Sequence, residues 1–168
     1  ASKFKRPLLY AASEANVDDY GALDKENDLP ICVKADSVEG LVPLTAKLTG
    51  MGLKDIVLDS GSRQIKQSLD DQVAIRRAAL KSGNRALGFP TITFPCEMAS
   101  NLDMETLIAG TFVAKYGGIT VLSDFSGESL FPLCLERLNI YTDPQRPMTV
   151  TGGIYEVNNP DENSPVMV

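Results

Sequence analysis

The sequence predicts an α/β fold built from repeated βα units around a parallel sheet. Short runs of β-forming residues alternate with longer amphipathic stretches, and the short runs are continuously apolar rather than alternating in polarity. The units recur about every 23 to 36 residues, whereas a closed (β/α)₈ barrel usually takes about 200 to 250 residues in total. With 168 residues and five units, the chain is predicted to be the C-terminal part of a TIM-type barrel or, alternatively, an open flavodoxin-like sheet.

The five predicted strands are short and are separated by turn residues. Because each is a nearly continuous apolar run, we expect both faces of each strand to be covered, as in parallel sheets. In chain order, they are Leu8–Ala12, Ile31–Ala35, Asp55–Leu58, Thr91–Phe94 and Ile119–Leu122.

A helix is predicted after each strand, and the first four are amphipathic. In chain order, the helices are Val17–Glu26, Val38–Met51, Ile65–Lys81, Met104–Tyr116 and Glu128–Leu138. The third is expected to bury one apolar side. That side consists of Ile65, Leu69, Val73, Ala74 and Leu80.

Polar residues at the helix starts support these boundaries. Asp36 and Glu39 have the spacing of a capping box, in which side chains satisfy the unpaired N–H groups of the first turn. Asn16, Asn101 and Ser126 are predicted to precede the first, fourth and fifth helices.

Polar or charged side chains follow the C-terminal end of every predicted strand, which is the edge where α/β folds bind ligands. These residues are Ser13, Glu14, Lys34, Asp36, Asp59, Ser60, Glu97, Ser123 and Asp124. Asp59 and Asp124 are the candidates for acid–base or pterin-binding groups that face each other across a barrel mouth. Alternatively, these side chains are helix caps and turn residues.

The turn Ser60-Gly61-Ser62-Arg63 is a candidate anion site, because backbone N–H groups at a helix start and an arginine both attract phosphate. It lacks the glycine pattern and the lysine of the known nucleotide-binding loops.

Composition excludes several classes of protein. The net charge of −6 argues against nucleic acid as a partner. The chain has no histidine, which removes the commonest general base and metal ligand. Its three cysteines, Cys32, Cys96 and Cys134, are far apart and too few for a cubane cluster. Because no apolar run is long enough to span a bilayer or to act as a signal peptide, we expect a cytoplasmic protein without a membrane partner.

The sequence ends in a long Pro- and Asn-rich segment that follows neither the strand nor the helix pattern. This segment and several stretches upstream of it resemble the large (gamma) subunits of corrinoid iron–sulfur proteins of the carbon monoxide dehydrogenase/acetyl-CoA synthase system. The resemblance covers nearly the whole chain. It is carried by Tyr141–Pro147, Ile154–Asn158 and Pro160–Val166, and upstream by Arg6–Ala12, Asp55–Gly61, Ile75–Leu80, Leu87–Thr91 and Val113–Tyr116.

The resemblance implies that residues 1–141 are part of a barrel domain and that residues 142–168 are a linker toward a corrinoid-binding domain. It further implies a methyl carrier with cobalamin and a [4Fe–4S] cluster, both bound outside this chain. The implied partners are the small subunit, a methyltetrahydrofolate methyltransferase and acetyl-CoA synthase. We therefore expect a scaffold with no catalytic, cofactor-binding or metal-binding residue of its own.

The alternative hypothesis is a small stand-alone enzyme that binds a phosphorylated or pterin substrate. Its site would consist of Asp59, Ser60, Arg63 and Asp124 at the strand ends.

Overall fold

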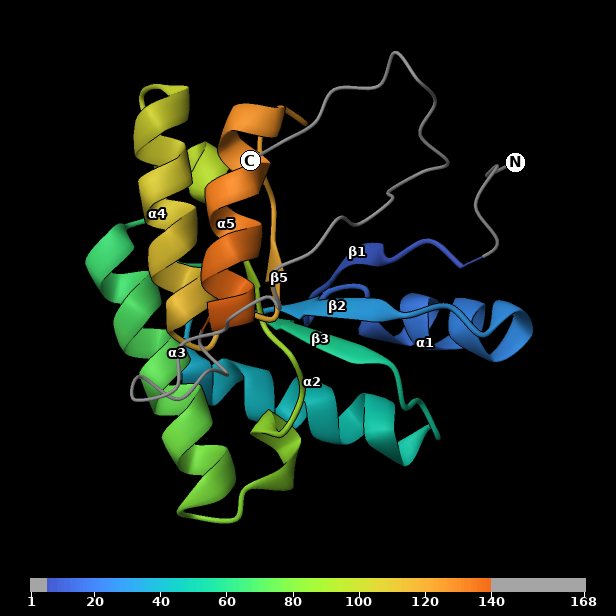
Figure 1. The fold of residues 1–168 in the computed structure, drawn as a ribbon. Coiled ribbons are helices and arrows are strands. Elements are labelled where there is room, and N and C mark those ends of the chain that lie inside the picture. Colours follow the sequence, from blue (N-terminus) through green and yellow to red (C-terminus); the bar gives the residue numbers. More distant parts are fainter. Residues whose placement is uncertain (1–5, 140–168) are drawn as a thin grey trace, which may run out of the picture.

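A computed structural model describes residues 6–139, with the backbone alone for residues 24–27. It contains five strands and five α-helices in strict alternation, so the α/β prediction is confirmed (Figure 1). The elements are β1 (Leu9–Ala12), α1 (Val17–Asn27), β2 (Ile31–Lys34), α2 (Val38–Gly50), β3 (Ile56–Asp59), α3 (Ile65–Leu80), the 3₁₀ turn η1 (Arg85–Leu87), β4 (Ile92–Thr93), the 3₁₀ turn η2 (Pro95–Glu97), α4 (Leu102–Ala114), β5 (Ile119–Thr120) and α5 (Gly127–Asn139). The predicted linker, residues 142–168, lies outside the described residues.

The strands are parallel and follow one another in sequence order. One sheet has the order β1-β2-β3, and the second pairs β4 with β5. A single parallel bridge between Leu58 and Thr91 joins the two sheets. Consecutive neighbouring strands occur around a barrel, whereas a flavodoxin-like sheet has the order 2-1-3-4-5. Within the described residues, the topology is therefore that of a partial barrel.

Strands β4 and β5 are shorter than the sequence suggests. Each pairs over only two residues, Ile92 with Ile119 and Thr93 with Thr120. The chain leaves β4 at Phe94 and enters η2 at Pro95. Since proline has no N–H to donate to a ladder, the strand ends there.

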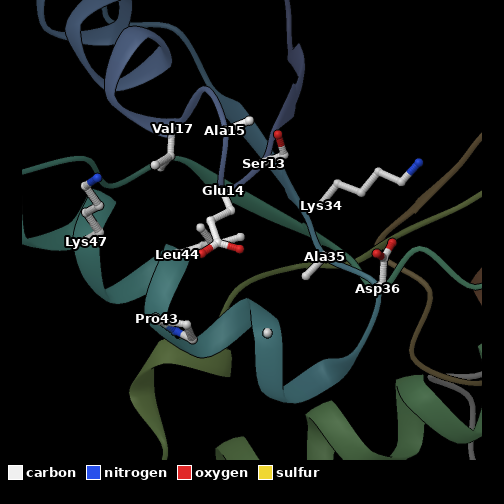
Figure 2. A pocket seen from close by; sticks show the side chains of 11 residues that line it. Ser13, Glu14, Ala15, Val17, Lys34, Ala35, Asp36, Pro43, Leu44 and Lys47 are labelled. Carbon is white, nitrogen blue, oxygen red and sulfur yellow. The ribbon is translucent and has the colours of Figure 1, made fainter.

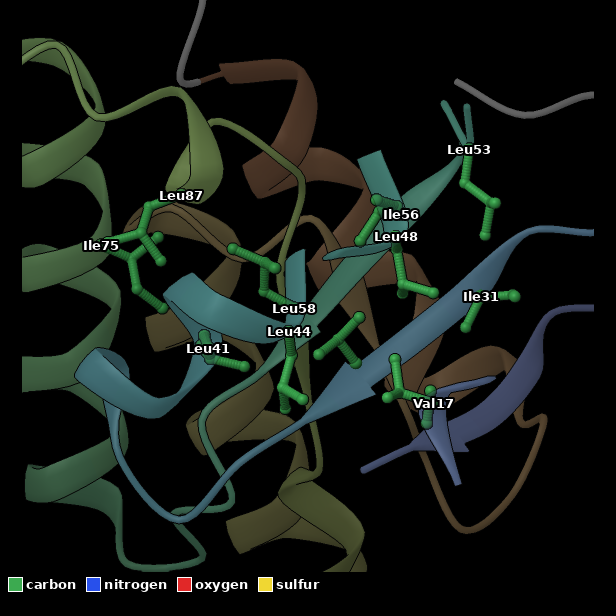
Figure 3. Close-up of a cluster of buried hydrophobic side chains, with 12 residues drawn as sticks. Val17, Ile31, Leu41, Leu44, Leu48, Leu53, Ile56, Leu58, Ile75 and Leu87 are labelled. Atoms are coloured by element: carbon green, nitrogen blue, oxygen red, sulfur yellow. The ribbon is translucent and has the colours of Figure 1, made fainter. Parts of the chain in front are cut away.

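The main core lies between β1–β3 and the helices that follow them. Strands β2 and β3 contribute every second side chain to this core, as the pleat of a strand requires. The opposing side chains come mainly from α2, with Ile75 of α3 and Leu87 of η1 at one end (Figure 3). This core comprises Ala12, Val17, Ile31, Val33, Leu41, Leu44, Leu48, Leu53, Ile56, Leu58, Ile75 and Leu87.

The opposite face of the sheets carries a second, smaller cluster, which we call the inner face. Its buried members are Cys32, Val57, Ile92 and Phe94, with Leu8, Cys96 and Val121 packed against them. Along β2 and β3, these side chains alternate with those of the main core and so point to the other face of the sheet. The inner face therefore corresponds to the side of the strands that lines the interior of a barrel.

Of the caps predicted for α2 and α4, one is wrong and one is confirmed. Helix α2 is capped by Ser37, whose hydroxyl accepts from the N–H of Gly40, so the predicted Asp36 cap is wrong by one residue. Helix α4 is capped by Asn101 as predicted, through the N–H of Met104. In both cases, a short polar side chain satisfies an N–H group that has no partner within the helix.

Helix α3 buries a polar face, contrary to the prediction. Its buried residues are Ser68, Asp71, Gln72 and Ile75. The predicted apolar side is largely accessible, with Ile65 and Leu80 both exposed and Ala74 exposed as well. Hydrogen bonds compensate for burial of the polar groups: Gln72 accepts from the Thr91 hydroxyl, and Asp71 accepts from Ser62 and Gln67.

Among residues 6–139, no helix is both long enough and apolar enough to cross a membrane.

Candidate functional site

The structure divides the predicted strand-end residues into two groups and leaves some of them apart. Residues at the ends of β1 and β2 surround a pocket, whereas Asp59, at the end of β3, and Glu97, at the end of η2, both bind Arg63. The two groups differ in how many of their polar atoms already have a hydrogen-bond or ion-pair partner, and this decides whether they could bind a ligand.

The pocket at the ends of β1 and β2 has a volume of about 760 Å³. It is lined by four of the predicted residues, Ser13, Glu14, Lys34 and Asp36, together with Lys47 and apolar side chains of α2. In Figure 2, the Lys34 side chain extends away from Glu14, so the two do not converge on a common point. The Ser13 N–H donates to Asn16, and Lys47 pairs with Asp18, at 2.7 Å.

The inner-face group centres on an ion pair between Asp59 and Arg63. Arg63 Nη1 lies 3.0 Å from Asp59 Oδ1, and Nη2 lies 2.9 Å from Oδ2. The Asp59 side chain is 2% exposed and that of Arg63 is 23% exposed. Bidentate geometry with little solvent makes this a strong, specific contact.

All five N–H groups of the Arg63 guanidinium have an acceptor. In addition to the two bonds to Asp59, Nη1 donates to the Ser62 carbonyl at 3.1 Å, and Nη2 donates to the Tyr10 hydroxyl at 3.0 Å. Nε donates to Glu97 at 2.5 Å. Because a guanidinium has five donors, no N–H of Arg63 remains for a phosphate. The predicted anion site at Ser60–Arg63 therefore lacks its main cation.

Asp59 is equally occupied. Oδ1 accepts from the Gly61 N–H at 2.8 Å as well as from Arg63, and Oδ2 accepts from the Tyr10 hydroxyl at 2.7 Å as well as from Arg63. Burial alone would raise the pKa of Asp59, but the hydrogen bonds from Arg63, Tyr10 and Gly61 outweigh it and lower the pKa below its ordinary value. A carboxylate in this state is a poor proton acceptor.

The pKa values of Tyr10, Arg63 and Cys32, which surround Asp59, are all raised. Burial and the hydrogen bond to Asp59 raise the pKa of Tyr10 above its ordinary value, while Asp59 raises that of Arg63. Burial also raises the pKa of the Cys32 thiol to about 12, with the charge of Asp59 adding to the effect. At neutral pH, Cys32 is therefore a thiol rather than a nucleophilic thiolate.

Aromatic rings cover the ion pair on one side. The Arg63 guanidinium carbon lies 4.2 Å from the centroid of the Phe94 ring, and the ring of Tyr10 lies 5.4 Å from that of Phe94. We call Tyr10, Asp59, Arg63, Phe94 and Glu97 the inner-face charge cluster. It connects β1 and β3 to the segment that follows β4, from Phe94 to the last residue of η2.

Gly61 allows the chain to form this cluster. Its φ of +76° lies in the left-handed region, and a Cβ atom there would lie 2.5 Å from the Ala35 carbonyl oxygen. Only glycine combines this conformation with such a close approach. The turn then returns the Gly61 N–H to Asp59 and places Arg63 beside the same carboxylate.

The remaining predicted residues lie apart from the cluster. Ser60 is buried. Ser123 donates both its N–H and its hydroxyl to Glu105, a buried carboxylate of α4. Asp124 is exposed and accepts from the N–H of Phe125, so it serves as a local turn residue and not as the partner of Asp59 across a mouth.

Sequence reasoning missed Tyr10, Phe94 and Glu105. The sequence predicts the first two only as strand residues, although the alternation of side chains along each strand allows Tyr10, Asp59 and Phe94 to share one face. Glu105 lies in the first turn of α4, where an acidic residue suits any helix, and gives no local signal of its contact with Ser123, 18 residues further along the chain.

Metal-binding groups do not converge in the described part of the chain. Between residues 6 and 139, no group of three or more Cys, Asp or Glu side chains is placed to hold a metal ion. The three cysteines are free and lie on β2, η2 and α5. A [4Fe–4S] cluster takes four thiolates, so the donor set of this chain does not suit it.

Comparison with known proteins identifies the family. The family described as CO dehydrogenase/acetyl-CoA synthase delta subunit matches residues 1–168. The corrinoid/iron–sulfur protein large subunit of Moorella thermoacetica is 41% identical over 98% of this chain and 36% of its own length. The acetyl-CoA decarbonylase/synthase complex subunit gamma of Methanopyrus kandleri is 34% identical over 98% of this chain and 37% of its own, and gamma 1 of Methanosarcina thermophila is 35% identical over 98% and 38%.

The chain thus spans somewhat more than a third of the length of these curated relatives. The resemblance to the large (gamma) subunits is confirmed along nearly all of its residues. The chain belongs to the CO dehydrogenase/acetyl-CoA synthase delta subunit family, together with the corrinoid/iron–sulfur large subunits and the gamma subunits of the decarbonylase/synthase complexes.

Proposed function

We propose that this chain is the barrel portion of the large subunit of a corrinoid iron–sulfur methyl carrier. The full-length subunit would pass a methyl group from a methyltetrahydrofolate methyltransferase to acetyl-CoA synthase in the reductive acetyl-CoA pathway. Its partners would be these two enzymes and the small subunit. The relatives, a corrinoid/iron–sulfur large subunit and a decarbonylase/synthase gamma subunit, support the class of protein, and the methyl-transfer role is our extension of it.

Within that subunit, we propose that residues 6–139 act as a scaffold and not as a catalyst. The observation that carries this proposal is the complete occupation of the inner-face charge cluster. Every donor of Arg63 has an acceptor, and Asp59 accepts four hydrogen bonds. A group that binds substrate or moves a proton needs an unoccupied position for the reacting atom. This cluster instead holds β1, β3 and the segment after β4 together.

Cobalamin and the iron–sulfur cluster would then belong to other parts of the subunit. Alkyl transfer on cobalt is the chemistry that the corrin supplies, and the protein positions it. This chain has no histidine and only three dispersed cysteines. Its own contribution would be a rigid barrel wall that holds the neighbouring parts of the subunit in place.

The test uses the natural-length protein with its corrinoid bound. The double variant Asp59→Asn, Arg63→Gln removes both charges and leaves a polar side chain at each position. Methylation of the corrinoid by methyltetrahydrofolate and its methyltransferase is followed by the absorbance change of the cobalt and expressed per mole of cobalt. We expect a rate within about threefold of the wild type, whereas loss of an acid–base group would cost about 10²- to 10⁴-fold.

A loss of that larger size, at unchanged cobalt content, would sink the scaffold proposal and restore the enzyme hypothesis. Absence of cobalt from the wild-type natural-length protein would refute the methyl-carrier role itself.

A further inference from the structure

A positively charged surface surrounds the C-terminal half of α3 and the turn η1 that follows it, at the bottom of Figure 1. Residues 72–96 contain four basic residues and no acidic one, although the whole chain has a net charge of −6. The four are Arg76, Arg77, Lys81 and Arg85, and all of them are exposed. This local excess of positive charge suits a negatively charged partner.

A cavity of about 310 Å³ opens within this surface, at the N-terminal ends of β4 and β5. Its apolar lining includes Ile75, Leu87 and Phe89, and its polar lining includes Arg76 and Tyr116. An apolar centre beside a charged rim is the usual anatomy of a protein interface.

Two cations flank the ring of Tyr116. The guanidinium carbon of Arg76 lies 6.0 Å from the ring centroid, and the ammonium of Lys115 lies 5.6 Å from it. Within residues 6–139, the structure pairs neither cation with a carboxylate. Both positive charges would attract an acidic group that approaches the ring.

The backbone at Tyr116 is in a conformation that favours glycine. Helix α4 ends in a Schellman-type turn, in which the N–H of Gly117 donates to the Phe112 carbonyl at 2.7 Å. The left-handed position of this turn, with φ of +68°, is occupied by Tyr116. Glycine would adopt it without steric cost, so the tyrosine ring is held there at the expense of backbone strain.

We propose that this cavity is a docking site for a carboxylate-bearing segment of a partner protein. An aspartate or glutamate of the partner would pair with Arg76 and Lys115 over the ring of Tyr116. A neighbouring apolar side chain of the partner would fill the space against Ile75, Leu87 and Phe89.

The geometry favours a protein segment over a small ligand. The cavity volume lies at the lower limit of small-molecule sites, which span about 300 to 1,000 Å³. Its cations are spread over α3 and the end of α4 on the exposed surface, and do not converge in an enclosed pocket. Two of the relatives are named as subunits of the acetyl-CoA decarbonylase/synthase complex.

The test is zero-length carbodiimide cross-linking of the natural-length protein, isolated with the subunits that accompany it. This reagent joins a lysine amine directly to a carboxylate, and mass spectrometry identifies both residues. We expect Lys115 to be joined to an Asp or Glu of another subunit. The yield of that product should fall about tenfold in Arg76→Glu, because a repulsive charge replaces an attractive one.

Two matched variants separate docking from structural damage. Lys66→Glu makes the same charge reversal in the first turn of α3, outside both the cavity lining and the positively charged surface, and should leave the yield unchanged. Tyr116→Gly suits the left-handed backbone, so the fold should be retained while the yield falls.

Cross-links from Lys115 only to its own chain or to a second copy would overturn the proposal. So would the absence of any Lys115 product while other lysines react, or an undiminished yield in Arg76→Glu or Tyr116→Gly. None of these readouts depends on methyl transfer, so the result stands however the test of the proposed function turns out.

Discussion

Replacement of Arg63 by methionine should loosen the part of the chain around β3, because it leaves the Asp59 carboxylate buried without its cation. Asp59 is 2% exposed and would keep only the hydrogen bonds from Tyr10 and Gly61. Removing one partner of a buried pair typically costs about 3 to 5 kcal/mol. The two retained bonds and the 23% exposure of Arg63 place the expected loss at about 3 kcal/mol.

Hydrogen–deuterium exchange of the natural-length protein measures this loss locally. A change of about 3 kcal/mol in the opening free energy corresponds to roughly 100- to 200-fold faster exchange. The acceleration should appear in peptides that cover β3 and the turn at Gly61, where Asp59 is held. Arg77→Met removes an exposed arginine from α3 and is the control, with an expected change below about threefold.

The double variant Asp59→Asn, Arg63→Met tests the mechanism itself. If the cost of Arg63→Met comes from an unpaired buried charge, removal of that charge should recover much of the protection. Exchange in Arg63→Met that matches the wild type would refute the reasoning. A double variant as labile as the sum of the two single variants would also refute it.

Three further predictions concern acid, backbone and thiols. The pKa of Asp59 is lower in the folded protein than its ordinary value of 3.8. Its ionised form therefore stabilises the fold above pH 3.8, and this stability is lost as the pH falls through that value toward the folded pKa. In an acid titration followed by circular dichroism, Asp59→Asn should lose less stability than the wild type. Gly61→Ala should destabilise the protein by at least about 1 to 2 kcal/mol because of the left-handed backbone and the contact with a carbonyl oxygen. Gly50→Ala has open space around the added Cβ and should stabilise α2 by about 0.5 to 1 kcal/mol. Equal effects of the two variants on the free energy of urea unfolding would contradict this. Alkylation of the native protein near neutral pH should modify the exposed Cys134 and spare Cys32, which is buried and has a raised pKa; mass spectrometry of the modified peptides checks the order, and urea should make both react.

The order and type of the elements were predictable because each strand is an apolar run of suitable length between amphipathic stretches. The ends were less predictable, because they depend on hydrogen bonds that long-range partners supply. Strand β4 stops at Thr93 since Pro95 follows closely and the chain turns into η2. Helix α2 begins after Ser37 and not after Asp36, although both are good capping residues.

Helix α3 shows why periodicity alone misplaced a face. Its sequence has enough apolar residues to suggest a buried stripe, yet Asp71 and Gln72 are buried and Ile65 is exposed. The buried polar groups have partners, Ser62 and Thr91, that lie outside the helix. A rule based on hydrophobicity has no access to those partners, because they become neighbours only when the sheet forms.

The role of Arg63 in the candidate site was also unpredictable from the sequence, because it depends on long-range partners. Asp59 ends β3 and Arg63 lies four residues further on, so from the sequence the two could form an ion pair or a ligand site. The two possibilities differ in whether any donor of the guanidinium remains unoccupied. Two of the five donors are occupied only because Tyr10 of β1 and Glu97 of η2 lie beside Arg63, and these residues are 53 and 34 positions away in the chain. Because all five donors are used, the arginine holds strands together, and binding of a ligand here would first have to break contacts that stabilise the fold.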